Sequence, residues 1–309
     1  MRAIKWEKQG LIVSPEDGLD WRSNHSGMVS ALPLSDGKCR MYLTGKNEKE
    51  GYRIGWLDLS QDFTVVYENT ENPVLAAGRM GCFDSHGVCM PMVVKLSDKV
   101  QYMYYVGWAP ALPGTIVNAC GLAVSSDGGT TWRRWSEAPL LCRDDRDPIG
   151  TGTVFVLRET PTFWRMWYTS FRNWDQLDDG RWRHFYHIRY AESDDGTHWR
   201  KPENNVAIDF VDESEYAVAR PMVVREPGGY RMWFCTRSVG STYRIGYAES
   251  EDGLTWQRKP AAIEPSSQGW DSEMIEYAYV LKEEEKYVMF YNGNGYGASG
   301  TGVAIGHLT

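Results

Sequence analysis

Acidic side chains stand just before four runs of apolar, strand-like residues in this chain. The four segments read Phe83-Asp84-Ser85-His86-Gly87, Asp144-Asp145-Arg146-Asp147-Pro148, Asp212-Glu213-Ser214-Glu215-Tyr216 and Trp270-Asp271-Ser272-Glu273-Met274-Ile275-Glu276. Two carboxyl groups that face one cavity can cleave an acetal bond, because one protonates the leaving oxygen while the other activates water. These segments therefore hold candidate catalytic residues.

A second group of polar and aromatic residues follows a later apolar run in each part of the sequence. It consists of Lys46, Trp108, Arg172 with Trp174, Arg237, and Asn292 with Asn294. Arginine forks bind carboxylates and phosphates, and a pocket of aromatic faces with a few polar groups holds a small ligand. If both groups meet at one face of the molecule, they suit a polyhydroxylated or anionic ligand.

A repeat of about 45 to 65 residues must position these groups. Its clearest mark is an aromatic run, which reads Arg40-Met41-Tyr42-Leu43, Tyr102-Met103-Tyr104-Tyr105, Arg165-Met166-Trp167-Tyr168, Arg231-Met232-Trp233-Phe234 and Tyr287-Val288-Met289-Phe290-Tyr291. Repeats of short strands at this period are typical of propeller blades. We therefore expect an all-β, five-bladed β-propeller that fills residues 1–309 as one domain.

The expected blades span approximately residues 20–75, 80–142, 145–208, 213–265 and 268–309. The fifth repeat ends early, and residues 6–13 match the stretch that follows Trp256 in the fourth. The N-terminal segment, about residues 3–13, is therefore predicted to join the last blade and close the ring, which removes exposed sheet edges.

Three Asp-Gly turns mark hairpins between the third and fourth strands of a blade. They lie in residues 125–132, 193–199 and 250–256, and each is followed by a tryptophan. Because a turn device that recurs in blade after blade serves structure, we assign these aspartates no chemistry. In a four-stranded blade these hairpins lie on one face, and the two groups of candidate residues lie on the opposite face.

Composition narrows the class of partner. The net charge is −8, whereas a nucleic-acid partner calls for a basic face. The sequence has no apolar run of membrane-spanning length and no signal peptide, so a cytoplasmic protein without a membrane partner is expected. The six cysteines lack metal-binding spacing and are interpreted as free thiols. The expected partner is a carbohydrate or another sugar-containing small molecule, and the oligomeric state stays open.

At the level of repeat pattern, the whole chain resembles the five-bladed propeller superfamily of glycoside hydrolase families 43, 32, 68 and 130. The sharpest local match is Arg146-Asp147-Pro148, which resembles the Arg-Asp-Pro element of family 32. The resemblance implies that Asp147 stabilises an oxocarbenium-like transition state and that Glu213 or Glu215 is the general acid. The family places its base or nucleophile Asp at the first blade, where this chain has Ser23-Asn24-His25-Ser26.

The expected activity is cleavage or transfer at a glycosidic bond. The candidate catalytic residues are Asp84, Asp147, Glu215, Glu213 and Glu276, with Asp84 as base or nucleophile. Candidate substrate-binding residues are His25, His86, Arg146, Arg172, Arg220, Arg237, Trp108, Glu273 and Asn292. Glu273, Glu276, His25 and His86 are alternative bases. On this basis Asp147→Asn lowers turnover by orders of magnitude with little loss of stability.

Other hypotheses stay open at this stage. The same scaffold suits a phosphorylase, a glycosyltransferase-like enzyme or a non-catalytic sugar-binding propeller. No cofactor and no metal site are expected, although a cation in the central channel is a further alternative. The segment from Phe171 to His187 is expected to be a long loop that acts as a lid or an oligomer contact.

Overall fold

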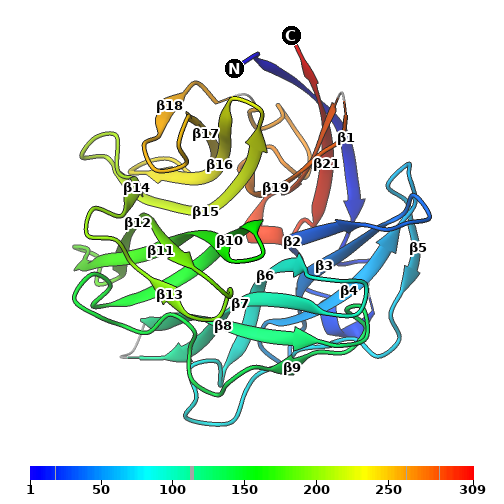
Figure 1. Cartoon of the computed structure of the whole chain (residues 1–309), viewed down its shortest axis with the longest axis horizontal. Helices are drawn as coiled ribbons and strands as arrows, with labels where there is room; N and C mark the ends of the chain where they lie inside the picture. Colours follow the sequence, from blue (N-terminus) through cyan, green and yellow to red (C-terminus); the bar gives the residue numbers. More distant parts are fainter. Residues whose placement is uncertain (18, 112–114, 262, 285) are drawn as a thin grey trace.

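The computed structural model describes residues 1–17, 19–111, 115–261, 263–284 and 286–309. The protein is all-β, with four sheets arranged around a common centre in a propeller-like manner (Figure 1). Within the described ranges, the helical elements are two short 3-10 turns, η1 (Asp20–Arg22) and η2 (Gly295–Gly297). The chain thus follows the strand-turn pattern of its repeats.

Three of the sheets have four antiparallel strands each. The first contains β2 (His25–Pro33), β3 (Cys39–Lys46), β4 (Arg53–Leu59) and β5 (Val65–Glu68). The second contains β6 (Gly87–Lys95), β7 (Gln101–Pro110), β8 (Ile116–Ser125) and β9 (Arg133–Arg134). The third contains β19 (Glu276–Lys282), β20 (Lys286–Asn292), β21 (Thr301–Leu308) and β1 (Ile4–Val13).

The fourth sheet has nine strands in two antiparallel groups. One group is β10 (Gly150–Thr160), β11 (Phe163–Gln176), β12 (Trp182–Ser193), β13 (Trp199–Arg200) and β14 (Val206–Ile208). The other is β15 (Glu215–Glu226), β16 (Gly229–Ser238), β17 (Arg244–Ser250) and β18 (Gln257–Lys259). One parallel bridge, between Tyr186 and Ala217, joins the two groups.

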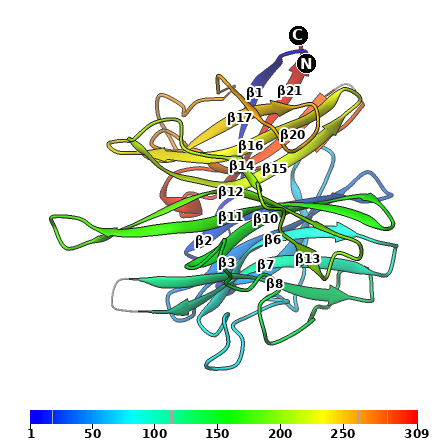
Figure 2. The same cartoon turned by 60° about the vertical axis from the view of Figure 1, so that its left-hand side comes forward.

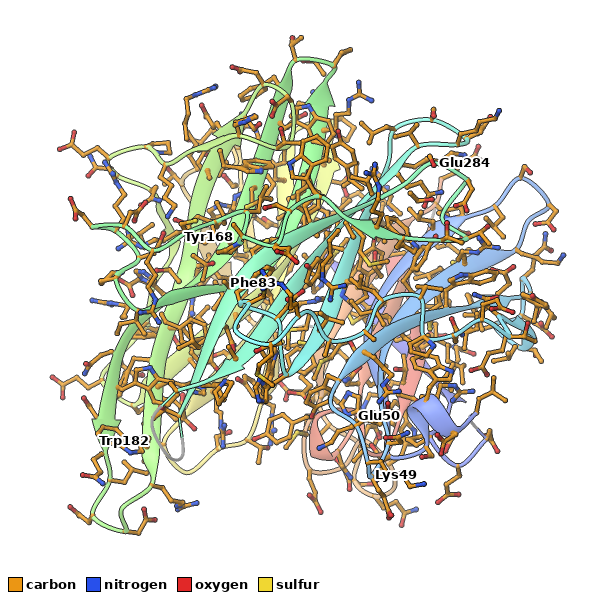
Figure 3. All side chains as sticks on the ribbon, turned by 90° about the horizontal axis from the view of Figure 1, so that it is seen from below. Lys49, Glu50, Phe83, Tyr168, Trp182 and Glu284 are labelled. Carbon is orange, nitrogen blue, oxygen red and sulfur yellow. The ribbon has the colours of Figure 1, made fainter. Side chains whose placement is uncertain are left out.

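The segment predicted as a long loop, from Phe171 to His187, is instead mostly paired strand. Strands β11 and β12 stay paired out to Gln176–Trp182, with one register shift between Phe171 and Asn173, so residues 177–181 alone form the turn. The hairpin extends well beyond the other strands (Figure 2), with Trp182 near its tip (Figure 3). The prediction was wrong because this stretch is long enough to extend both strands and pair with itself.

The two ends of the chain lie side by side (Figure 1). Strand β1 pairs antiparallel with β21 from Ile4–Leu308 to Val13–Thr301, which is the pairing expected from the sequence. The Lys8 ammonium also donates to the Asp271 carboxylate at 2.6 Å. The first residues of the chain therefore complete the sheet built by the last ones.

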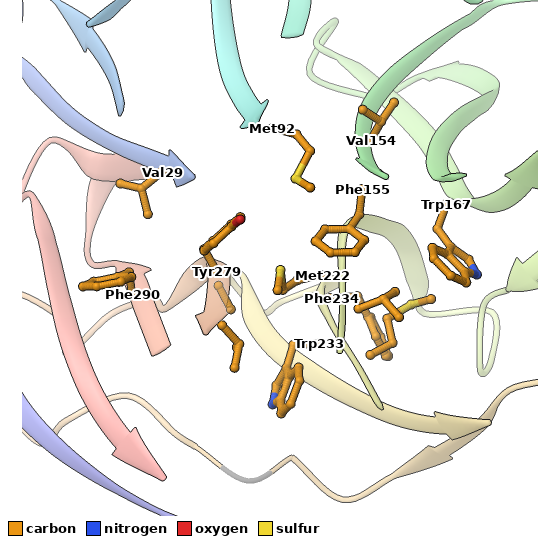
Figure 4. Close-up of a cluster of buried hydrophobic side chains, with 14 of the residues drawn as sticks. Val29, Met92, Val154, Phe155, Trp167, Met222, Trp233, Phe234, Tyr279 and Phe290 are labelled. Atoms are coloured by element: carbon orange, nitrogen blue, oxygen red, sulfur yellow. The ribbon is translucent and has the colours of Figure 1, made fainter. Parts of the chain in front are cut away.

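The apolar core surrounds the innermost strand of each group. These strands contact one another in the order β2, β6, β10, β15 and β19, and β19 also contacts β2. Their buried side chains, Val29, Met92, Val154, Met222 and Tyr279, gather in one region (Figure 4). Such strands are buried on both faces, which explains why their sequences are almost continuously apolar.

Each innermost strand carries a β-bulge at the same place. Register shifts occur at Gly27/Ser30, Cys89/Met92, Thr151/Val154, Ala219/Met222 and Glu276/Tyr279. Met28, Met90, Arg220 and Tyr277 have positive φ at these bulges, between 52° and 56°. Bulges re-aim side chains at functional sites, and non-glycine residues hold this conformation only where their surroundings impose it.

The Asp-Gly turns have the structural role that the sequence indicated. In the turn at Asp127, the carboxylate accepts from the amides of Thr130 and Thr131, and the Ser125 hydroxyl accepts from the amide of Gly129. The turns at Asp195 and Asp252 repeat this pattern. The Tyr42 hydroxyl reaches from the preceding sheet to the Gly129 carbonyl, so the turns also join neighbouring sheets.

Candidate active site

A cavity of about 280 Å³ lies over the five bulges. Its floor includes Met28, Met90, Gly152, Ala219 and Tyr277, from the five innermost strands. Its walls are mainly aromatic and contain Tyr52, Trp108, Phe171, His184, Tyr186, Arg237, Tyr243 and Tyr296. An apolar, aromatic hollow with a few polar groups on the axis of the fold is the usual form of a small-molecule site.

One acidic residue, Glu276, stands directly behind the cavity wall. It is fully buried, and neither carboxyl oxygen has a hydrogen-bond partner of normal geometry among the described residues. Burial raises the pKa of Glu276 well above its ordinary value, and the Arg237 charge and the Tyr277 side chain oppose that shift only in part. Burial therefore favours the protonated form of this carboxyl group.

Glu276 differs in chemical type from the residues at the four equivalent positions of the fold. The equivalent residues before the other four bulges are Gly27, Cys89, Thr151 and Ala219, none of which is acidic. An unpaired buried carboxyl is costly to keep, so its occurrence at one position out of five equivalent ones points to a function rather than to the needs of the fold.

Asn292 is the cross-strand neighbour of this acid, and His25 and Asn292 both lie against Gly297. Asn292 pairs with Glu276 across β19 and β20, and its amide accepts from the Met28 backbone and donates to the Tyr296 carbonyl. His25 is buried, and its Nε2 has no partner among the described residues. Burial, with a smaller effect of Lys46, lowers the pKa of His25 to about 3, so the imidazole is neutral at neutral pH.

Arg237 is the positively charged side chain among the described residues that line the cavity. Its guanidinium lies 5.5 Å from the Tyr216 ring centre and 5.4 Å from that of Tyr243. Nearby His184 is packed edge-on against Trp174, with ring centres 4.7 Å apart. Burial and the Arg237 charge lower the pKa of His184 to about 4, so this imidazole is also neutral.

Asp84, Asp147 and Glu215 were expected to share the mouth of this cavity, and none of them lines it. Each is buried and bonded within its own group of strands. Asp84 accepts from the Tyr105 hydroxyl at 3.0 Å and Arg134 at 2.8 Å. Asp147 accepts from the Tyr168 hydroxyl at 3.0 Å and also from Ser170 and Lys201. Glu215 accepts from Thr236 and, at 2.9 Å, from Arg258.

These contacts form a repeated structural device. The hydroxyl donor follows the carboxylate by 21 positions in all three cases, and a basic residue from the outer part of the group completes it. Asp271, with Tyr291 and Lys8, makes the same arrangement. In the first sheet the charges are reversed, because Arg22 pairs with Glu68. The carboxylates before the strands therefore tie the inner end of each sheet to its outer strand.

The remaining predicted residues divide into two sets. Trp108 and Arg237 line the cavity, and Glu276, His25 and Asn292 lie behind its wall. Glu213, Glu273, His86, Arg146 and Arg172 are exposed and do not line it. Arg172 is paired instead with Asp209 at 3.0 Å.

Arg220 lies below the floor rather than in the cavity. It is fully buried at the bulge of β15, and its guanidinium donates to the Val29 carbonyl at 2.6 Å and the Pro91 carbonyl at 3.5 Å. These carbonyls belong to β2 and β6, so Arg220 links three innermost strands across the centre. We assign it a structural role in holding the axis together.

The tyrosines of the wall were not found by sequence reasoning. Tyr52 and Tyr243 stand one residue before β4 and β17, the third strands of their groups. The third strand of each group begins on the face where the second strand ends, which is the face that holds the cavity. The position of Tyr52 and Tyr243 just before a third strand was therefore the sequence signal that could have identified them. Tyr186 and Tyr243 hydrogen-bond to each other through their hydroxyls, which joins two groups of strands at the cavity.

Replacing Glu276 by glutamine is expected to change how stability depends on pH. The folded protein keeps a proton on Glu276 that the unfolded chain releases above about pH 4.5. The free energy of unfolding should therefore fall as pH rises above this value, by at most about 1.4 kcal/mol per pH unit, until pH passes the raised pKa.

Urea denaturation of the wild type and Glu276→Gln from pH 5 to pH 8 measures this difference. Contributions of His25, His184 and His187 are common to both proteins and cancel. The difference in stability should move in favour of the variant as pH rises. Parallel curves would show that Glu276 ionises normally in the folded protein.

The fold is that of known propeller structures. One described as "Glycoside hydrolase" has a TM-score of 0.74 at 17% identity and covers 96% of this chain and 90% of its own. The β-1,2-mannobiose phosphorylase from Listeria innocua, in complex with β-1,2-mannobiose, has a TM-score of 0.71 at 11% identity, covering 98% and 96%. At such identities these matches define the class of fold, the propeller-like fold of glycoside hydrolase structures.

Sequence comparison finds two relatives of higher identity. Two Mycobacterium tuberculosis proteins are 37% identical to it over 307 residues, which are 98% of this chain and 99% of each relative. They are described as "Uncharacterized protein MT1551", from strain CDC 1551 / Oshkosh, and "Uncharacterized protein Rv1502", from strain ATCC 25618 / H37Rv. The chain belongs to the same family as these two proteins. No family model matches it.

Within the ranges that the structure describes, no three His, Cys, Asp or Glu side chains are grouped so that they could hold a metal ion. In the same ranges, no helix has the length and apolar character that crossing a bilayer requires.

Proposed function

We propose that the groups of strands form five blades of a single β-propeller, with β1 completing the last blade, and that the axial cavity binds a carbohydrate. The order of contacts among the innermost strands, their five matching bulges and the β1–β21 pairing support this arrangement. The aromatic walls suit the apolar faces of a sugar ring, and Asn118, Thr153 and Thr169 offer groups for its hydroxyls.

The proposed reaction is cleavage or transfer at a glycosidic bond, with Glu276 as proton donor. The observation that carries this proposal is a fully buried carboxyl group beside the cavity whose oxygens have no hydrogen-bond partner of normal geometry among the described residues, an environment that favours its protonated form. Such a group can give its proton to the leaving oxygen as the bond breaks. It resembles the arrangement of other carboxylic acids whose raised pKa lets them act as acids at neutral pH.

Glu276 does not line the cavity, so a bound sugar would have to meet it past the aromatic wall. Its charge is felt by Tyr52, Tyr243 and Tyr277, all of which line the cavity. Tyr296 covers the same region, is partly exposed, and has positive φ between Gly295 and Gly297. A shift of this glycine-flanked residue is the smallest movement that would bring the acid and a bound sugar together.

A non-catalytic sugar-binding protein is the second candidate. The observation in its favour is that no Asp or Glu is among the described residues that line the cavity. Hydrolysis normally needs a second carboxylate to activate water or form a covalent intermediate. A phosphorylase needs no such group, since phosphate itself attacks the sugar.

A panel of oligosaccharides and aryl glycosides, assayed with and without inorganic phosphate, tests these alternatives. Product formation that Glu276→Gln abolishes supports the enzyme, and dependence on phosphate separates phosphorolysis from hydrolysis. Calorimetric binding without any product supports the second candidate. If no member of the panel binds, the cavity is not a carbohydrate site.

A further inference from the structure

The Arg237 guanidinium faces the cavity without a counter-charge. Arg237 ends up at the cavity wall because it stands near the end of β16. Among the described residues it has no ion-pair partner, and its Nε is buried without a hydrogen-bond acceptor. Buried Arg22 and Arg231 are paired with Glu68 and Glu226, and Arg220 donates to two backbone carbonyls, whereas no such bond is found for Arg237 among the described residues. The cost of an uncompensated, partly buried cation points to a missing anion.

The groups around Arg237 do not supply that anion. The rings of Tyr216 and Tyr243 flank it, and Tyr186 and Tyr296 lie nearby. Burial raises the pKa of Tyr186 and Tyr243, so their hydroxyls stay neutral. Glu276 is near enough to feel the Arg237 charge, yet its burial keeps it protonated. None of these groups therefore compensates the Arg237 charge.

We propose that the sugar bound in this cavity carries an acidic group of its own, a carboxylate or a phosphate ester, which binds the Arg237 guanidinium. This inference rests on the proposed function of the cavity as a carbohydrate site. The planar guanidinium fork matches both kinds of oxyanion, and the aromatic wall lowers the local dielectric and strengthens the contact. His184 adds a buried ring nitrogen, Nδ1, that has no partner among the described residues.

An anion at Arg237 would also act on Glu276. Its negative charge opposes ionisation of the carboxyl group, so the acid keeps its proton while the substrate is bound. The other titratable groups that face Glu276 are neutral and come from several elements: Tyr52, Cys235, Tyr243 and Tyr277. Binding of the acidic sugar is therefore linked to retention or uptake of one proton at Glu276.

Matched pairs of neutral and acidic sugars test the inference on the full-length protein. Calorimetry compares glucose with glucuronate and glucose 6-phosphate, and galactose with galacturonate, and includes inorganic phosphate alone. The acidic member of a pair should bind about 10- to 100-fold more tightly, as expected for a hydrogen-bonded charge pair. Glucuronate and glucose 6-phosphate also show whether the acidic group is a carboxylate or a phosphate ester.

Arg237→Met should remove this preference, Arg237→Lys should keep part of it, and Arg200→Gln should not change it. Arg200 is the matched control because it is exposed and paired with Asp194. Thermal unfolding shows whether each variant is folded. If Arg237→Met does not fold, the preference for acidic sugars is compared between the wild type and Arg237→Lys instead. At a pH high enough for the free protein to lose part of the Glu276 proton, glucuronate binding in buffers of different ionisation enthalpy should show proton uptake in the wild type and none in Glu276→Gln.

Two outcomes would overturn the inference while leaving the proposed function intact. One is equal affinity for neutral and acidic sugars, unaffected by Arg237→Met. The other is binding of inorganic phosphate at Arg237 together with a neutral sugar, which would make the anion a co-substrate. Failure of every sugar to bind would instead contradict the carbohydrate site itself.

Discussion

Replacing Glu276 by glutamine is expected to lower turnover about 100- to 10,000-fold, the usual contribution of a general acid. Glutamine has nearly the same shape but no proton of suitable acidity. Because the wild-type carboxyl is buried without a partner, the variant should fold at least as well at neutral pH. The measurement is turnover and sugar affinity on the same preparation, with affinity expected to change only a few-fold.

The pH dependence of turnover provides a second readout. Glu276 must be protonated to act, so activity should be lost as pH rises through its raised pKa. Glu283→Gln is a suitable control, since Glu283 is exposed and paired with Lys286 at 3.1 Å. Turnover by Glu276→Gln at the wild-type rate would remove this residue from the chemistry and favour another proton donor.

The repeat made much of the fold predictable. Aromatic runs at a regular period indicated the strand order, and the match between residues 6–13 and the stretch after Trp256 indicated that β1 joins the last sheet. The face that holds the cavity also followed from the repeat, which is why Trp108 and Arg237 were found. The long β11–β12 hairpin was missed because no local signal distinguishes an extended hairpin from a loop of the same length.

The site was only partly predictable, for a physical reason. A carboxylate before a strand has the same sequence signature whether it faces a ligand or a lysine. Asp147 was singled out by the tripeptide Arg146-Asp147-Pro148, yet its partners are Tyr168, Ser170 and Lys201. The nearest of these is 21 positions away in sequence and Lys201 is 54, so the pairing becomes visible only once the sheets are in place.

Asp147→Ala is expected to lower the free energy of unfolding by about 3–5 kcal/mol, the usual cost of removing one partner from a buried ion pair. The Asp147 side chain is fully buried and that of Lys201 is 8% exposed, so the lysine would keep only its pair with the exposed Asp144, and the hydroxyls of Tyr168 and Ser170 would lose their acceptor. Such a loss is a large part of the roughly 5–15 kcal/mol that stabilises an ordinary domain. Chemical denaturation at pH 7 measures it.

Two comparisons separate this structural role from a catalytic one. Asp147→Asn combined with Lys201→Met removes both charges and should recover part of the lost stability, because the carboxylate left without Lys201, that of Asp144, is exposed to water. Asp194→Ala, which breaks the exposed pair with Arg200, should change stability by less than about 1 kcal/mol. Turnover per folded molecule should stay within a few-fold of wild type in the double variant.

Substitutions of Asp147 and Glu276 are thus expected to have opposite effects on stability and turnover. The Asp147 carboxylate accepts from three donors of the fold, so its replacement should lower the free energy of unfolding. A buried carboxyl without a partner does not stabilise the fold, so replacing it should lower turnover without lowering stability at neutral pH. If Asp147→Asn proved stable and inactive while Glu276→Gln stayed active, the ion-pair interpretation would be wrong, and the residue that resembles the family 32 motif would regain the catalytic role.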